Sequence, residues 1–445
     1  MLKNYIEKGG NKQLKNKTFI RKIIMSLITL SKKIFVIYKS LIFIFKNKKS
    51  ILKNKFIIIY ASRTFGHDLH FMEVVSRIYY PRNLSFIIIP NERINNFLLE
   101  AYSHNLEFFK FEVNPILNEW TARWLKLIFF YFEIKYISWP KNYVVDPRHV
   151  IQTLSLDEGQ YSFSPKNKSL IFHKNTPISQ LRHLINNNIG KSPSLPKAIK
   201  DECINKITQK WPKFFKKPIA AIVLRRKGYL GDGMNGKLRM AGPHENYKKS
   251  IEYLVQNNFN VVGTGDTLHE KFKKIKGYFD ITEAGIEVDC ANIFILSNSK
   301  IYLGQNSGPY PMINSTGGRC LITDVQPLSF ASIGDNDLML YKDIFINGIK
   351  TEISEIFKKR PELCFDKITF AKDVEVKENT AEDILRAVKE MVALYNGKVT
   401  SEETIKLSNN LKKIAPKTSL LAHFKSRPPA FILERNKKIL LMKNS

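Results

Sequence analysis

The sequence predicts an α/β protein with two Rossmann-type domains that face a cleft, preceded by a basic amphipathic helical segment. Short apolar runs rich in β-branched residues alternate with runs of helical spacing, which is typical of parallel sheets built from βαβ units. The chain has 445 residues, more than one hydrophobic core usually covers, so two domains are expected. The predicted ranges are 1–55 for the basic segment, 56–210 and 211–396 for the two domains, and 397–445 for a helical tail.

Positive charge is concentrated at the start of the chain. The net charge is +31, and residues 1–55 supply +14 of it through fourteen Lys, one Arg and one Glu. The hydrophobic share of 44% and the charged share of 25% are those of a globular protein rather than a disordered one. The basic excess favours an anionic partner, which includes lipid headgroups, nucleic acid and anionic substrates.

The basic segment predicts attachment to a membrane surface. Lysines interrupt the apolar runs of residues 19–46, so no run reaches the roughly 18–20 uncharged residues that a spanning helix needs. No small-residue cleavage site follows a single apolar run, which argues against a signal peptide. Lysines beside Ile, Leu and Phe suit a helix that lies on a membrane. Its lysines would contact anionic lipid headgroups, and its apolar face would insert beneath them. The alternative is an ordinary surface helix packed on the first domain.

The four cysteines are widely spaced and form no paired motif. This spacing predicts neither a zinc site nor a disulfide framework, and it favours a reducing cytoplasm. We expect them to act as small buried apolar residues: Cys203, Cys290, Cys320 and Cys364.

The first predicted domain opens with a βαβ pattern. Residues 56–62 form an apolar strand, a helix is expected over 69–80, and the next strand lies at 84–90. Such a unit places the intervening loop at the carboxyl edge of the sheet, where ligands bind. Further elements of this domain are expected as a strand over 106–113 and helices over 91–104, 121–136, 178–189 and 196–210.

The second predicted domain repeats the alternation. Its most periodic helix, over 380–396, opens with Thr380 as N-cap and carries Glu382 and Asp383 in the first turn, where negative charge is favourable. Other elements are expected as strands over 220–226, 259–266, 300–305 and 319–325, and as helices over 246–257 and from residue 309.

The first candidate binding loop is rich in Arg and Gly. In LRRKGYL at 224–230 the arginines follow a strand, and a guanidinium can pair with two phosphate oxygens at once. Arg225 or Arg226 is therefore predicted to bind a diphosphate and to stabilise its charge as it leaves. Neighbouring strand residues point to opposite sheet faces, so one of the two is expected to be functional, with Arg225 as the catalytic candidate. A basic strand end in solvent is the alternative. The predicted binding residues of this loop are Arg225, Arg226, Gly228 and Arg239.

Two further loops of the second domain suit contacts with phosphate. Asn306, Ser307 and Gly308 follow a strand and precede a helix, whose first amides attract anions if Ser307 caps it. Gly263 and Gly265 follow the neighbouring strand and permit close backbone approach. Plain helix capping and a plain turn explain the same residues without a ligand.

The loop of the first domain carries the candidate base. Gly66 would let the backbone approach a ligand, and His67 or Asp68 could deprotonate an acceptor hydroxyl. Asp289 in the second domain could hold ribose or sugar hydroxyls. For each of these polar residues, helix capping or a surface position is the alternative.

No Asp-x-Asp pair directly follows one of these predicted strands. No metal ion and no cofactor are therefore expected, and arginines with helix dipoles would balance the charge of the donor substrate. Together the loops predict a nucleoside-diphosphate pocket and a transferase that uses a sugar nucleotide.

The C-terminal half resembles a bacterial glycosyltransferase family found in surface-polysaccharide gene clusters, for capsule or O-antigen. This family is similar to GT-B enzymes of the fucosyltransferase type. The resemblance rests on LRRKGYL, on QNSGP at 305–309, on SRTFGHD at 62–68 and on AFILERNKKIL at 430–440. It covers about residues 56–440, although Gly263 stands where the family would have Arg.

The loops and the resemblance together predict an inverting, metal-independent hexosyl- or deoxyhexosyltransferase. The donor would be a nucleoside-diphosphate sugar, and the acceptor a glycan or a lipid-linked precursor. The enzyme would be cytoplasmic and peripheral to the inner face of the cell membrane, with no nucleic-acid partner. The alternatives are a non-catalytic nucleotide- or glycan-binding relative and, because of the charge, a nucleic-acid-binding protein.

Overall fold

The computed structural model describes the larger part of the chain. The described residues are 26, 30–53, 56–61, 68–69, 72–73, 76–77, 80–81, 83–89, 94–112, 120–121, 124–125, 127–128, 161–164, 169–172, 185, 190–225, 241–265, 267, 269–364, 368, 371–417 and 419–442. They fall into two compact units, which are described separately. Unit 1 comprises Met1–Arg63, Asn83–Ile94 and Leu106–Lys141, and unit 2 comprises Thr64–Arg82, Asn95–Asn105 and Asn142–Ser445.

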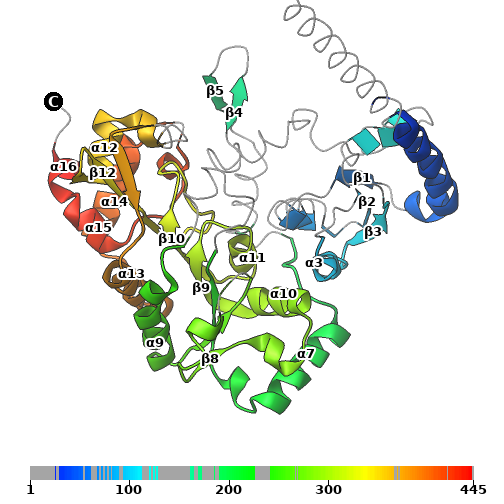
Figure 1. The fold of residues 1–445 in the computed structure, drawn as a ribbon, viewed down its shortest axis with the longest axis horizontal. Helices are drawn as coiled ribbons and strands as arrows, with labels where there is room; N and C mark the ends of the chain where they lie inside the picture. Colours follow the sequence, from blue (N-terminus) through cyan, green and yellow to red (C-terminus); the bar gives the residue numbers. More distant parts are fainter. Residues whose placement is uncertain are drawn as a thin grey trace, which may run out of the picture. The chain divides into compact units, whose positions relative to one another are not determined.

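Unit 1 contains a three-stranded parallel sheet (Figure 1). Its strands lie in sequence order, and the middle strand is buried along its whole length. A strand in the middle of a parallel sheet is covered on both faces, which explains its continuous apolar run. The predicted strands are confirmed, with bounds β1 Phe56–Ala61, β2 Leu84–Ile89 and β3 Leu106–Lys110.

Within unit 1, a helix over residues 30–51 packs onto the three-stranded sheet. Ile44 and Ile51 enter a buried cluster with Ile87 and Ile89 of β2. The Ser85 hydroxyl donates to the carbonyl of Ile51 at 2.7 Å and joins the end of the helix to the same strand. Within the described part of the chain, no helix combines the length and the apolar character needed to cross a bilayer.

Unit 2 contains a six-stranded sheet in which every neighbouring pair is parallel. The order is β11-β10-β9-β6-β7-β8, so the chain builds from β6 to one side and then returns to build the other. This is the doubly wound order of a Rossmann fold, with its switch point between β6 and β9. The bounds are β6 Ile219–Val223, β7 Asn260–Gly263, β8 Tyr278–Phe279, β9 Ser299–Gln305, β10 Arg319–Val325 and β11 Leu338–Tyr341.

Helices pack against this sheet, and further helices follow towards the C-terminus of the chain (Figure 1). The α-helices are α3 Asn96–Ala101, α7 Lys197–Lys210, α9 Lys248–Gln256, α10 Val288–Asn298, α11 Tyr310–Ser315, α12 Ile353–Lys359, α13 Ala381–Tyr395, α14 Glu402–Ile414, α15 Ala430–Arg435 and α16 Lys437–Leu441. The 3-10 helices are Phe214–Lys216, His244–Tyr247, His269–Lys271, Ile281–Ala284, Pro361–Cys364 and Leu420–Ala422. The predicted α/β class with parallel, Rossmann-like sheets is confirmed in each unit.

The core of unit 2 follows from strand alternation. Ala220 and Ile222 point from β6 into a buried cluster with residues of α9 and α13. Ala221 and Val223 point to the opposite face, and α10 packs against β6. As predicted, α13 begins after Thr380, whose hydroxyl accepts a hydrogen bond from the backbone N–H of Asp383 at 3.1 Å.

Two small antiparallel sheets were not predicted. One has the order β13-β12-β14 and the other pairs β4 with β5. Asn347 and Gly348 join β12 to β13 with φ of 50° and 78°, the left-handed pair that a tight hairpin turn needs. The bounds are β12 Asp343–Ile346, β13 Ile349–Thr351, β14 Val374–Lys377, β4 Tyr161–Ser164 and β5 Ser169–Phe172.

All four cysteines are buried free thiols, as expected. Two of them, however, lie in contact with each other, one on each of two neighbouring helices. The sulfur atoms of Cys203 in α7 and Cys290 in α10 are 3.5 Å apart. Their separation of 87 residues gave no sign of this contact in the sequence.

Asp337 is a fully buried carboxyl just before β11. It accepts hydrogen bonds from the Ser332 hydroxyl at 2.5 Å and from the Cys320 backbone N–H at 2.7 Å. Burial nevertheless raises its pKa to about 7, because the charged form has lost its solvation.

This raised pKa predicts that folding stability depends on pH. The protonated carboxyl is the form favoured by the folded chain, so its contribution is complete below the unfolded pKa of about 4 and is lost as pH rises through about 7. We expect the wild type to lose about 2 kcal/mol more free energy of unfolding between pH 5 and pH 8 than Asp337→Asn does. Urea denaturation at both pH values measures this, and equal losses would contradict it.

Candidate functional site

The carboxyl ends of β6 and β9 meet at the switch point of the six-stranded sheet. The backbone N–H of Arg225 donates to the side-chain oxygen of Gln305 at 2.9 Å, so the two strand ends are tied together. Gly304 permits this approach, since an added Cβ would lie 2.2 Å from the carbonyl oxygen of Val223. In open α/β sheets, ligands bind outside the strand ends at this point.

A buried hydrogen-bond network holds the ends of β6 and β9 in place. Gln305 Nε2 donates to the Tyr247 hydroxyl at 2.8 Å, and that hydroxyl donates to Asp324 Oδ2 at 2.7 Å. Asp324, near the end of β10, also accepts from the backbone N–H groups of Gly242 and Asn379 at 3.0 and 2.7 Å. Burial raises the pKa of Asp324 and that of the Tyr247 hydroxyl. Sequence reasoning missed these residues because their partners are far along the chain.

The loop after β9 places Asn306, Ser307 and Gly308 half-buried at this edge. The Tyr302 hydroxyl donates to the carbonyl of Gln305 at 2.8 Å, so the Ser307 hydroxyl, 3.0 Å away, donates to Tyr302. The expectation that Ser307 caps the next helix is wrong. Helix α11 has Pro309 at its N-cap and no side-chain cap.

The turn after β7 lies against the beginning of α10. Gly265 is exposed with φ of 62°, and its N–H donates to Asn292 Oδ1 at 3.1 Å. Asp289 is exposed in the first turn of α10, three residues before Asn292 and thus on the same helix face. Gly263 is buried at the end of β7, where an added Cβ would lie 2.0 Å from the Tyr278 hydroxyl oxygen.

The structure therefore brings several predicted residues to one sheet edge. Three strand ends and one helix start contribute to it: Arg225, Gly263, Gly265, Asp289, Asn306, Ser307 and Gly308. Other predicted residues lie outside the described part of the chain: Gly66, His67, Arg226, Gly228 and Arg239. Asp68 is described, and it is helical and buried.

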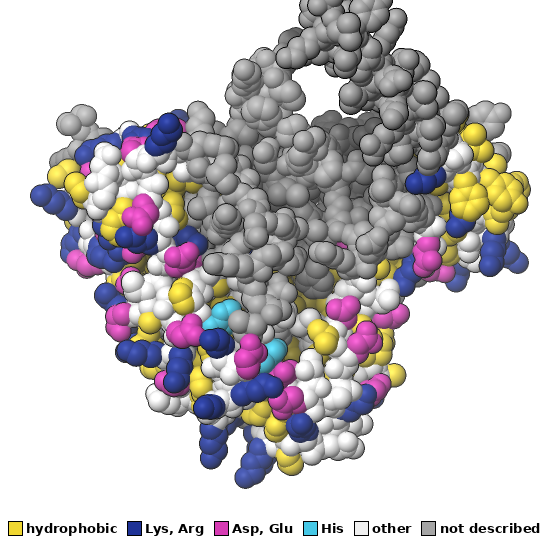
Figure 2. Space-filling model, in the orientation of Figure 1, with side chains coloured by type: hydrophobic (Ala, Val, Ile, Leu, Met, Phe, Trp, Pro, Cys, Tyr) yellow, Lys and Arg dark blue, Asp and Glu magenta, His cyan; other side chains and the backbone are white. Residues whose placement is uncertain are grey.

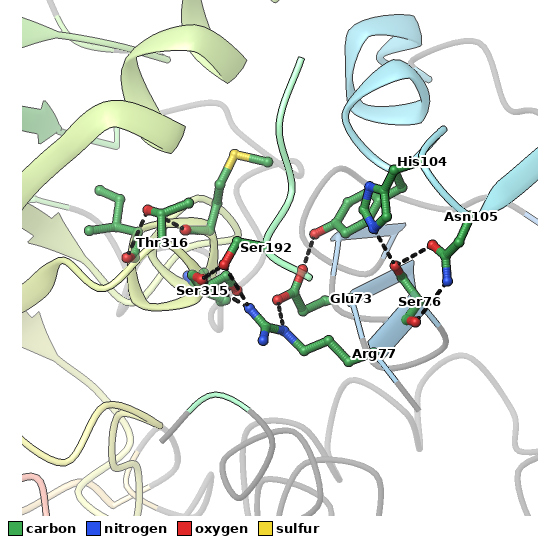
Figure 3. Close-up of polar contacts among 12 residues, drawn as sticks. Glu73, Ser76, Arg77, His104, Asn105, Ser192, Ser315 and Thr316 are labelled. Atoms are coloured by element: carbon green, nitrogen blue, oxygen red, sulfur yellow. Dashed lines mark hydrogen bonds and ion pairs between the residues drawn. The ribbon is translucent and has the colours of Figure 1, made fainter. Parts of the chain in front are cut away.

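A second buried cluster holds the helical residues that follow Asp68 (Figure 3). Glu73 accepts from Arg77 Nε at 2.5 Å and from the Tyr102 hydroxyl. The Arg77 guanidinium also donates to the carbonyl of Ser315 at 2.9 Å, at the C-terminal end of α11. Arg77 thus links Glu73 to α11, the helix that begins just after the 306–308 loop.

Metal binding has no visible site in the described residues. No group of three His, Cys, Asp or Glu side chains there is placed to bind an ion. Asp335 and Asp337 have Asp-x-Asp spacing, but Asp335 pairs with Lys425 at 2.7 Å, and the hydrogen bonds of Asp337 are internal.

Comparisons with known proteins find similarity only among solved structures. No protein-family model matches the chain, and no curated protein matches it. A glycosyl transferase family 9 structure from Veillonella parvula is 10% identical, with a TM-score of 0.40, covering 76% of this chain and 97% of its own. The structure of Escherichia coli ADP-heptose LPS heptosyltransferase II is 11% identical, with a TM-score of 0.40. The match covers 77% of this chain and 99% of that structure.

A similar structure of another kind is the UDP-GlcNAc 2-epimerase from Neisseria meningitidis bound to UDP-GlcNAc. It is 12% identical, with a TM-score of 0.30, covering 77% of this chain and 100% of its own.

The Gln305 amide should be needed to hold the strand ends. In Gln305→Ala the partly buried N–H of Arg225 and the buried Tyr247 hydroxyl each lose a partner. We expect the free energy of unfolding to fall by about 1–3 kcal/mol. The neighbouring Asn306→Ala, on the half-exposed loop, should stay within about 0.5 kcal/mol of wild type. Chemical denaturation tests both, and equal effects would argue against the network.

The Glu73–Arg77 pair should matter far more than an exposed ion pair. Arg77→Ala would leave Glu73 and the Ser315 carbonyl buried without this donor, so we expect a loss of about 3–5 kcal/mol. Arg360 also contacts two carboxylates, Glu362 and Asp373, but it is partly exposed. Arg360→Ala is expected to destabilise the protein much less, because solvent screens its ion pairs. Similar losses in both variants would contradict this role of Arg77.

Proposed function

We propose that the chain is a glycosyltransferase that moves a sugar from a nucleoside-diphosphate sugar to a surface-glycan or lipid-linked acceptor. One observation carries the proposal: Arg225 and the 306–308 loop are held side by side at the switch point of a doubly wound sheet. This is the place where such folds bind nucleotides.

The donor diphosphate would bind at this edge through two kinds of group. The Arg225 guanidinium offers a fork of donors that matches phosphate oxygens. The backbone N–H groups of the 306–308 loop offer further donors without a counter-charge. Asp289, exposed at the start of α10, would hold hydroxyls of the ribose or the sugar. The network beneath keeps these donors in fixed positions, so little reorganisation accompanies binding.

The proposed reaction is a direct displacement with inversion at the anomeric carbon. The acceptor oxygen forms the new glycosidic bond while the bond from that carbon to the diphosphate oxygen breaks. His67 or Asp68 takes the proton of the acceptor hydroxyl. The bonding electrons leave with the diphosphate, and Arg225 stabilises its growing charge without a metal ion.

The acceptor and the cellular location belong to the same proposal. A basic segment at the start of the chain would hold a cytoplasmic enzyme at the inner membrane face, where lipid-linked acceptors lie. A hexose or deoxyhexose is the proposed sugar.

Arg225 should be required for binding of nucleoside diphosphates. We expect Arg225→Gln to weaken binding of the diphosphate that stabilises the wild type best by about tenfold or more, because a charge-assisted contact is lost. Arg319→Gln is the matched control, since Arg319 begins β10 at the opposite edge of the same sheet. A thermal-shift screen of UDP, GDP, CDP and ADP selects the ligand, and calorimetry measures Kd.

Two outcomes would contradict the proposal. Equal binding by both Arg variants would place the diphosphate elsewhere. The second outcome is that the wild type binds a sugar nucleotide but transfers no sugar to a lipid-linked acceptor. If His67→Ala and Asp68→Asn then behave like the wild type, the non-catalytic relative is favoured.

A further inference from the structure

The helix over residues 30–51 has two apolar sides, and unit 1 covers only one of them. Val36, Ser40, Ile44 and Ile51 recur at helical spacing and are buried. The other side also carries large apolar residues at helical spacing, but these are exposed. Ile34 is 58% exposed, Tyr38 61%, Ile42 47% and Phe45 75%. We call these four residues the outer face of the helix.

Lysines surround the outer face. Residues 30–53 contain seven Lys and neither Asp nor Glu. Lys39 and Lys46 are exposed next to the outer face, and Lys39 Nζ lies 5.0 Å from the ring centroid of Phe35. Figure 2 shows yellow apolar side chains with dark blue Lys beside them where Figure 1 draws this helix.

We propose that the outer face is a docking surface for an anionic lipid bilayer, on which the helix lies flat. Tyr38 and Phe45 enter the boundary between headgroups and acyl chains, while lysines contact lipid phosphates. Charge selects this occupant. A second copy of the chain would bring its own seven lysines against these seven, which is unfavourable. An uncharged apolar partner would leave the lysines without a counter-charge.

The structure also fixes how the helix can meet the bilayer. Its buried side is held to β2 through Ile44, Ile51 and the contact of the Ser85 hydroxyl with the Ile51 carbonyl. The helix is about 33 Å long at 1.5 Å per residue, and both of its apolar sides run along this length. Flat docking buries the outer face without removing the inner face from the core.

Flotation of the full-length protein with vesicles tests this proposal. We expect binding to phosphatidylcholine vesicles that contain phosphatidylglycerol, and little binding to phosphatidylcholine alone. Tyr38→Ser with Phe45→Ser should lower the vesicle-bound fraction by about tenfold or more, since both aromatic anchors are lost. The matched control is Val399→Ser with Ile405→Ser, two apolar residues exposed on unit 2.

A second pair of substitutions separates the contribution of the lysine charges from that of apolar insertion. Lys39→Gln with Lys46→Gln should weaken binding to phosphatidylglycerol vesicles and make it less sensitive to salt, because two lipid contacts are lost. Failure of the wild type to float with anionic vesicles would overturn the proposal, as would unchanged binding by the aromatic variant. So would self-association in sedimentation velocity that the aromatic variant abolishes while its vesicle binding persists.

This inference deepens the proposed membrane location and does not depend on sugar transfer. Nucleotide binding by Arg225 is measured in solution without lipid, and vesicle binding is measured without nucleotide. Either result can fail while the other stands.

Discussion

The side-chain amide of Gln305 is the contact on which the candidate site depends. Its oxygen accepts from Arg225, and its nitrogen donates to Tyr247, so both ends of one buried amide are used. A side-chain amide carries an acceptor oxygen and a donor nitrogen, so one residue can hold both partners. The positions at which the chain leaves β6 and β9 are thereby set by the same side chain. A ligand at the switch point would therefore contact strand ends whose positions are already fixed before it binds.

Much of this fold was predictable because its signals are local. The bounds of β10 agree with the expected strand residue for residue, and α13 begins after its expected cap. Apolar runs, helical periodicity and capping residues act over a few neighbours, which a sequence displays directly. The β12–β13 hairpin was missed although it also has a local signal. Asn347 followed by Gly348 is the pair that such turns favour.

The candidate site was only partly predictable, since its frame depends on distant partners. Tyr247 and Asp324 are 77 residues apart, and Tyr247 and Gln305 are 58 apart. Nothing in the local pattern distinguishes these buried polar residues from surface ones. The predicted loops could be placed because strand ends of a parallel sheet share one edge. For His67 and the other predicted residues outside the described part of the chain, the roles remain predictions.

Docking of the helix over residues 30–51 on a bilayer, as proposed above, would change how often the proposed enzyme meets its acceptor. An enzyme moored along a bilayer and an acceptor carried by a lipid diffuse in the same plane, so they meet as partners confined to two dimensions. Such confinement raises their effective concentration without any added contact between them. Under this proposal a low affinity for the acceptor would suffice, and the elongated product would dissociate quickly.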